Sequence, residues 1–267
     1  MRVAEPVLAP WKADLSLGFS CRNRKSLLTE RHSDGPLVVQ KPLYPEGDAV
    51  CHAIVVHPPG GIAGGDELRL KVKTDQESAA LLTTPGAGKW YRSGGPWARQ
   101  SLSFAVDGTL EWLPRETIVF DGARASLESR IELGEQAGYI GWEILCLGRT
   151  GSGERFSKGQ IRIATEIYRS GKPLLVERGR IDGGGPIMSS PAGLADHSVV
   201  GTFIAAGNVA PVPGNEAVAT TLLPGVLVGR YLGDSSEEAM HAFTRLWEAV
   251  RPAIAGREAV RPRIWST

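Results

Sequence analysis

Short runs in which apolar and polar residues alternate recur along most of the chain. The alternation is clearest in ELRLKV (67–72) and RIATEIYR (162–169), where one face is apolar and the other is largely charged. Such runs are typical of half-buried strands in an antiparallel sheet. The pattern predicts strands at 51–57, 67–74, 78–84, 100–106, 109–113, 123–133, 139–147, 160–169, 173–181, 198–207, 217–223 and 225–232.

One of these runs differs from the rest. YIGWEILCL (139–147) is apolar on both faces except at Glu143, which indicates a central strand. Few segments with helical periodicity lie between the strands, so alternating strand–helix units are not expected.

One long helix is predicted toward the end of the sequence. Ser235 and Glu238 have capping-box spacing, and Pro252 is expected to end or kink the helix. An apolar stripe follows the cap: Ala239, Met240, Phe243, Leu246, Trp247 and Val250. The stripe suits packing on the chain's own sheet or in a partner's groove. A second short helix is expected at 189–197.

These elements predict a mainly β fold: a large antiparallel or mixed multi-stranded β scaffold with one or two helices toward the C-terminus. No repeat, low-complexity tract or shift in composition divides the sequence, so one domain over residues 1–267 is expected. The 33 glycines and 18 prolines lie between the apolar runs, where they mark turns.

Charge and cysteine content narrow the functional classes. The 30 basic and 29 acidic residues nearly cancel without blocks of like charge, which argues against nucleic-acid or membrane-surface binding. The first residues lack the apolar core of a signal peptide, and no run of about 18 apolar residues occurs. The three cysteines form no pattern, as expected for reduced thiols in a cytoplasmic protein.

Two glycine-rich stretches are superficially similar to nucleotide-binding loops, but neither matches the required motif. TPGAGKWYRS (84–93) contains Gly88-Lys89, but Thr83 stands where a phosphate-binding loop needs glycine and Trp90 where it needs a hydroxyl. In HPPGGIAGGDELRLKV (57–72) the glycines come as two pairs, and a strand pattern follows instead of a helix. Nucleotide binding is not predicted.

No complete catalytic or metal-ligating set is visible either. The five histidines have no zinc-site spacing, and there is no nucleophile elbow. Carboxylates are more suggestive: Asp66 and Glu67 follow the glycine turn, and Glu116 and Asp121 bracket TIVF (117–120). They suit an acid–base pair of a glycosidase, or they accept backbone N–H bonds in tight turns. The cluster KWYRS (89–93) suits either binding of an anion or carboxylate or a surface loop.

Three stretches resemble the urease accessory protein family UreD, called UreH in some organisms: HPPGGIAGGDEL (57–68), LLTTPGAGKWYRS (81–93) and LEWLPRETIVFDGA (110–123). GWEILCLGRTGSGERFSKGQI (141–161), PLLVERGRI (173–181) and RPRIW (261–265) agree as well. UreD sequences often carry TPGATKFYRS where this chain has Gly88 and Trp90.

The resemblance implies a β-rich, non-enzymatic scaffold. Similar proteins partner the helical protein UreF, with two copies of each, and through it the GTPase UreG. That assembly docks on the structural subunits of apo-urease and helps deliver nickel(II), which is in transit and not tightly bound.

Site residues follow as hypotheses. Nickel in transit needs exchangeable oxygen and imidazole ligands, so a hydrated passage is expected to use Asp66, Glu67, Glu116, Asp121 and His57. Candidate partner contacts are Lys89, Tyr91, Arg92, Arg115, Phe243, Trp247, Arg263 and Trp265. The rival hypothesis is a β-rich hydrolase in which Glu116 works with Asp121 or Asp66.

Overall fold

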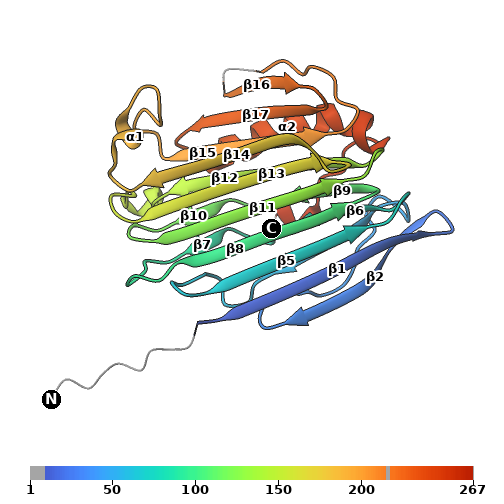
Figure 1. Ribbon diagram of the computed structural model, residues 1–267, viewed down its shortest axis with the longest axis horizontal. Coiled ribbons are helices and arrows are strands. Elements are labelled where there is room, and N and C mark those ends of the chain that lie inside the picture. Colours follow the sequence, from blue (N-terminus) through green and yellow to red (C-terminus); the bar gives the residue numbers. More distant parts are fainter. Residues whose placement is uncertain (1–9, 215–216, 267) are drawn as a thin grey trace.

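Two large β-sheets lie face to face, and one long helix packs against the outer side of the second sheet (Figure 1). The computed structural model describes residues 10–214 and 217–266. No helix within these ranges is both long and apolar enough to cross a membrane. The fold class expected from the sequence, a mainly β scaffold with helices toward the C-terminus, is confirmed.

The first sheet has seven strands in the order β14-β13-β11-β8-β5-β1-β2. Their bounds are β1 (Lys12–Arg22), β2 (Lys25–Asp34), β5 (Glu67–Thr74), β8 (Ala98–Val106), β11 (Arg124–Leu133), β13 (Gln160–Arg169) and β14 (Lys172–Asp182). β1 and β2 are absent from the sequence prediction.

The second sheet has ten strands, eight of them in the order β16-β17-β15-β12-β9-β6-β4-β3. Their bounds are β3 (Val38–Val39), β4 (Cys51–Val56), β6 (Ala79–Thr83), β9 (Thr109–Leu113), β12 (Gly138–Leu147), β15 (Val199–Ala206), β16 (Val218–Leu223) and β17 (Val226–Gly233). Two short strands, β7 (Gly88–Trp90) and β10 (Thr117–Val119), attach beside β12. The expected central position of 139–147 is confirmed, since β12 has neighbours on both sides.

From β4 to β13 the chain coils between the two sheets. β4, β6, β9 and β12 lie in the second sheet and alternate along the chain with β5, β8, β11 and β13 in the first. Successive strands within each sheet pair in parallel. Each crossover is therefore a strand of the opposite sheet, as in coiled β-solenoids, and needs no helix.

The antiparallel setting expected for 67–72 is therefore wrong. β5 pairs in parallel with both β1 and β8. Its alternation arises because Leu68, Leu70 and Val72 enter the core while the intervening residues face solvent. A half-buried strand has this pattern whether its neighbours run parallel or antiparallel.

The long helix α2 (Ser236–Ala255) begins where the capping box predicts. The Ser235 hydroxyl accepts the backbone N–H of Glu238 at 3.2 Å. The helix continues through Pro252 and ends at Gly256, which has a left-handed conformation. All six residues of the predicted stripe are buried against β12, β15 and β17, so the stripe packs on the chain's own sheet.

The second predicted helix is displaced. α1 (Pro186–Ser189) ends where the expected segment 189–197 begins, and turns occupy 191–196. Two short 3-10 turns complete the fold, η1 (Thr150–Ser152) and η2 (Arg263–Ser266).

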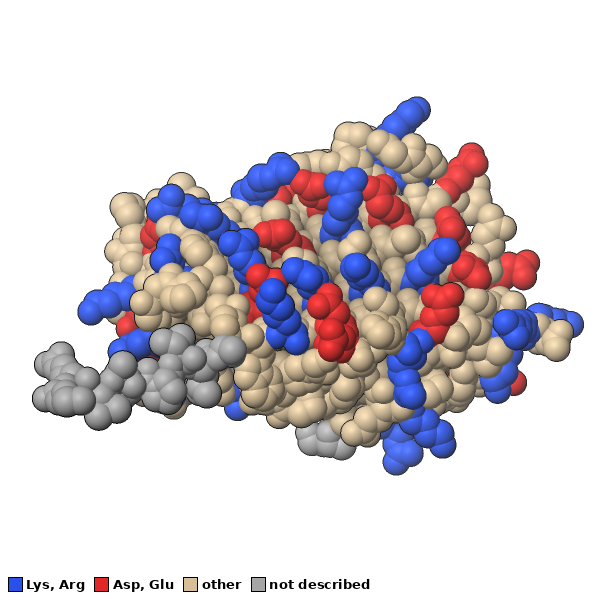
Figure 2. Space-filling model, turned by 60° about the horizontal axis from the view of Figure 1, so that its bottom comes forward, with Lys and Arg blue, Asp and Glu red and all other residues tan. Residues whose placement is uncertain are grey.

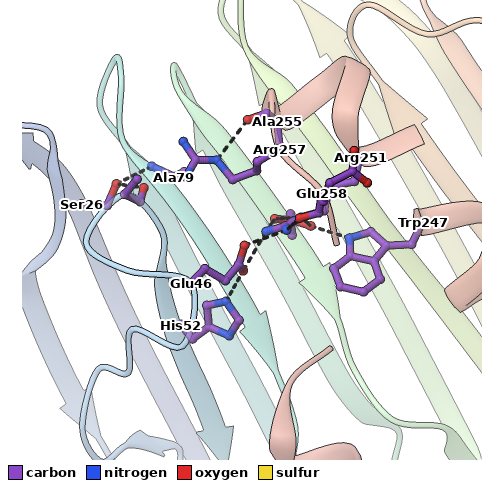
Figure 3. Close-up of polar contacts among 11 residues, drawn as sticks. Ser26, Glu46, His52, Ala79, Trp247, Arg251, Ala255, Arg257 and Glu258 are labelled. Carbon is purple, nitrogen blue, oxygen red and sulfur yellow. Dashed lines mark hydrogen bonds and ion pairs between the residues drawn. The ribbon is translucent and has the colours of Figure 1, made fainter. Parts of the chain in front are cut away.

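A buried cluster of charges fastens α2 to the second sheet (Figure 3). Arg251 is 0% exposed and pairs with Glu111 of β9 at 2.9 Å and with Glu46 at 2.7 Å. Glu46 also contacts His52 of β4 at 2.6 Å, and the Trp247 indole donates to Glu111 at 2.5 Å. Burial raises the pKa of Glu46, but hydrogen bonds from His52 and Arg251 outweigh it and lower that pKa below its ordinary value.

Candidate functional site: a cavity between the sheets

A cavity of about 1060 Å³ lies between the two sheets. Its apolar walls include Leu68, Leu70 and Leu102 of the first sheet and Tyr139 and Leu145 of the second. Exposed residues also line it at two places, Pro85–Lys89 and Arg178–Arg180, where it reaches the molecular surface.

The second sheet has a gap beside this cavity. β12 pairs with β9 through Gly141 and with β10 from Leu145 onward, which leaves 142–144 without a partner strand on that side in the described part of the chain. The pairing of β6 with β9 also stops, at Thr83 and Leu113. Segment 84–88 and the residues Pro114, Arg115 and Thr117 form the rim of the gap and line the cavity. We call this gap the aperture.

Glu143 lies at the aperture and faces the cavity. It belongs to the inward face of β12, between Tyr139 and Leu145, and is paired across the sheet with Thr202 of β15. Among the described residues, none forms a hydrogen bond or ion pair with its carboxyl group. Burial raises the pKa of Glu143 to about 7. Near neutral pH the cavity therefore holds a carboxyl group that is partly protonated.

His57 is the second titratable side chain of interest in the lining. It follows β4, and its Nε2 is buried without a hydrogen-bond partner in the described part of the chain. Burial lowers the pKa of His57, although the Asp66 carboxylate opposes this. The imidazole is accordingly neutral at pH 7, the form that binds metal ions.

These groups do not form a metal cage. Within residues 10–214 and 217–266, no three His, Cys, Asp or Glu side chains converge on one point. No described cysteine lines the cavity. The lining therefore offers isolated oxygen and nitrogen ligands, which bind a metal ion more weakly than a closed set.

Asp66 and Glu67 lie outside the cavity lining. The two carboxylate oxygens of Asp66 accept the backbone N–H groups of Trp11 and Ala63, each at 2.8 Å. Glu67 pairs with Arg69 at 2.7 Å on the solvent-facing side of β5. Basic and acidic side chains are intermixed in rows on the side of the molecule shown in Figure 2. Asp66 therefore caps the glycine turn, and Glu67 belongs to the outer surface.

Asp121 and Glu116 are also absent from the cavity lining. Asp121 accepts the N–H of Ser157 at 2.7 Å, its hydroxyl at 3.0 Å and the N–H of Lys158 at 2.8 Å. Burial raises the pKa of Asp121, but these hydrogen bonds outweigh it and lower the pKa overall. Glu116 lies 3.6 Å from Arg115. The four carboxylates that were expected to line a passage therefore lie outside the cavity lining. Of the five residues predicted to contact nickel, only His57 lines the cavity.

Four of the predicted partner residues, from the stretches 84–93 and 110–123, lie near the aperture or the glycine turn. Lys89 is exposed and Arg115 half-buried, and both line the cavity. The Tyr91 ring packs edge-on against Phe120, with ring centroids 5.1 Å apart. Arg92 lies 3.8 Å from Asp121. Lys89, Tyr91 and Arg92 are all exposed, as a partner contact requires.

The remaining partner candidates divide into buried and accessible residues. Phe243 and Trp247 are 0% exposed, so in this fold neither can contact a partner. Arg263 is exposed. Trp265 is half-buried, and its indole donates to the Thr83 hydroxyl at 2.9 Å.

Sequence reasoning missed Glu143 as a site residue, although a signal for it was present. It is the only charged residue in an otherwise apolar central strand. Burying a carboxyl group without a partner in such a strand costs folding free energy, so its presence there indicates a function.

Comparison with known proteins gives one consistent result. The sequence profile of the UreD urease accessory protein family matches residues 12–266. A protein of Dechloromonas aromatica (strain RCB) named urease accessory protein UreD is 48% identical, covering 99% of this chain and 98% of its own length. Proteins of the same name from Azoarcus sp. (strain BH72) and Pseudomonas aeruginosa are 49% and 45% identical. Both cover 96% of this chain, and 94% and 95% of their own lengths.

Proposed function

Because the chain belongs to the UreD family of urease accessory proteins, we propose that it helps deliver nickel(II) to the active site of apo-urease. It acts in the cytoplasm in complex with UreF and the GTPase UreG, with two copies each of this protein and UreF. The role is that of a scaffold and metal conduit, and the chain itself catalyses no reaction.

The observation that carries the conduit is the position of Glu143. This carboxyl group faces an internal cavity at a gap in the sheet, with neither an ion pair nor a hydrogen bond from the described residues. A divalent cation entering the cavity is stabilised by the carboxylate form and releases the proton. Since one carboxylate binds nickel weakly, the ion can move on.

The rest of the lining supports transit and not storage. His57 adds a neutral imidazole with an unpartnered nitrogen. Thiolates would hold the ion more tightly, and the described lining contains none. Nickel is therefore the cargo of this site and not a resident cofactor.

Partner contacts are assigned to the accessible members of the predicted set. Lys89 on β7 and Tyr91 and Arg92 directly after it are exposed, and Arg263 lies on η2. Cations and a tyrosine ring suit a partner surface with acidic side chains. UreF is the expected partner at these residues, and UreG and the urease subunits complete the assembly.

The hydrolase alternative receives no support from the geometry. Hydrogen bonds lower the pKa of Asp121, which argues against a role as general acid. Asp66 uses both oxygens to cap a turn. Asp121 likewise accepts three hydrogen bonds from Ser157 and Lys158, so both carboxylates have the contacts of turn caps and not of a catalytic pair.

The test is a deletion of this protein in cells that keep urease, UreF and UreG. Urease is purified, and its activity and its nickel content per active site are measured. We expect inactive, nickel-poor urease, restored by expressing the wild-type chain. Fully loaded and active urease from the deletion strain would refute the proposal.

A further inference from the structure

Three loops leave the second sheet at the same end. They directly follow β7, β10 and β12 and comprise residues 91–93, 120–122 and 148–158. Since these strands are neighbours and run parallel, their carboxyl ends lie at one edge of the sheet. Backbone hydrogen bonds join the loops: Ser93 donates to the Gly122 carbonyl at 3.1 Å, and Gly122 donates to the Lys158 carbonyl at 2.9 Å. We call these three loops the corner.

Side-chain contacts cross-link the loops of the corner. Arg149 forms an ion pair with Glu154 at 2.7 Å, and its guanidinium lies 4.5 Å from the centre of the Phe120 ring. Phe120 packs in turn against Tyr91. Glu154 also accepts the backbone N–H of Asp121 at 3.1 Å. These side chains are therefore held in place before a partner binds, which lowers the entropic cost of binding.

Within the corner, the acidic side chains lie beneath the basic ones. The Asp121 side chain is 16% exposed, whereas that of its neighbour Arg92 is 74% exposed. The Glu154 side chain is 20% exposed, whereas that of its partner Arg149 is 48% exposed. The outermost layer of the corner is therefore cationic, although each cation has a carboxylate below it.

Lys158 adds a further cation to this layer. It is exposed, and its ammonium group forms no ion pair within residues 10–214 and 217–266. The outer face of the first sheet has a different arrangement, because its acidic and basic side chains are exposed to similar degrees. There Arg130 is 53% exposed and its partner Glu132 is 40% exposed. The corner thus presents positive charge, whereas that face presents both signs.

The chemistry of the corner fits a protein surface that carries carboxylates. Exposed cations attract carboxylates, and arginine and tyrosine often supply much of the binding energy of a protein interface. A nucleic acid fits less well, because its binding depends on neutralising several phosphates at once. In the corner, the three cations Arg92, Arg149 and Lys158 stand above two carboxylates, which leaves a net charge of +1.

We propose that the corner is a docking face for a carboxylate-rich surface of UreF, in which Arg149 and Lys158 extend the contact assigned above to Tyr91 and Arg92. The identity of the partner rests on the proposed function. The acidic character of its surface and the inclusion of the loop 148–158 rest on the corner itself.

The experiment measures the dissociation constant of the purified full chain for purified UreF at about 50 mM and about 300 mM NaCl. Lys158→Glu reverses one exposed charge of the corner. Lys71→Glu is the matched control, because Lys71 is an exposed lysine on the solvent-facing side of β5. Circular dichroism checks that both variants are folded. Lys158→Gln, which removes the charge without reversing it, keeps the test valid should Lys158→Glu misfold.

We expect Lys158→Glu to weaken UreF binding about tenfold at the lower salt concentration, and Lys158→Gln to weaken it less. At the higher concentration the difference from wild type should shrink to about twofold, because salt screens charges across an interface. Lys71→Glu should leave the dissociation constant unchanged at both concentrations.

Three results would overturn the docking face. The first is wild-type affinity for UreF in both Lys158 variants. The second is an equal loss at both salt concentrations, which would mean that the contact is not electrostatic. The third is an equal loss with Lys71→Glu, which would mean that only the overall charge matters. None of these results depends on nickel, so they are separate from the urease loading that tests the proposed function.

Discussion

At position 143 a carboxyl group stands where the neighbouring inward residues of β12, Tyr139 and Leu145, are apolar or aromatic. An unpaired buried carboxylate is unfavourable unless a cation or a proton joins it. The property that suits Glu143 to the proposed passage of a cation therefore also destabilises the folded protein when the carboxyl group is ionised.

This destabilisation predicts a pH dependence of stability. The pKa of Glu143 is about 7 in the folded protein against an ordinary value of 4.5. The folded state therefore holds the proton over a range in which the unfolded state has lost it, and stability falls as pH rises from about 4.5 to above 7. Glu143→Gln removes this loss, so its advantage over wild type should grow by about 3 kcal/mol between pH 4.5 and 8. Urea denaturation across that range checks it; an advantage that does not change with pH would contradict the assignment.

The glycine turn gives a second residue-scale prediction. A Cβ atom at Gly61 would lie 2.2 Å from Cε2 of Tyr91, so Gly61→Ala must displace that ring. We expect a loss of about 1 to 3 kcal/mol in the free energy of unfolding. Gly86→Ala is the control, since a Cβ there meets no atom within 4 Å. The loss should shrink when Tyr91→Ala is also present, and a full-sized loss in that background would exclude the clash as its cause.

For the strands, the sequence pattern predicted where each strand lies along the chain better than it predicted which strands pair and in which direction. The strands 67–74, 109–113 and 160–169 were placed at the bounds that the structure has. Their parallel coiling was not predicted, because alternation reports which face is buried and says nothing of neighbour direction. The helix start at Ser235 was correct because a cap is a local signal.

The buried cluster predicts how strongly α2 is fastened. Arg251→Ala would leave Glu46 and Glu111 buried without their cation, so we expect a loss of about 3 to 5 kcal/mol. Arg261→Ala removes the exposed pair with Glu248 and should cost at most about 1 kcal/mol. Chemical denaturation at pH 7 compares the two variants. Equal losses in the free energy of unfolding would show that the buried cluster stabilises the attachment of α2 no more than an exposed ion pair does.

For the whole molecule, the cavity and the aperture arise from segments far apart in sequence. The aperture needs the register of β6, β9, β10 and β12 together, so no single motif could reveal it. Asp66 and Asp121 stood out in the sequence because they follow turns, and turn capping is what the structure assigns to them. The family could be recognised from its motifs, whereas the cavity residues required the fold.

We propose that nickel reaches urease through the cavity past Glu143. The most direct measurement is the nickel content per active site of urease purified from cells that carry Glu143→Ala in this protein. Glu128→Ala, an exposed glutamate on the outer face of β11, is the control, and co-purification with UreF is followed in both. We predict nickel-poor urease with Glu143→Ala, normal loading with Glu128→Ala and unchanged co-purification. Full nickel loading with Glu143→Ala would contradict the account.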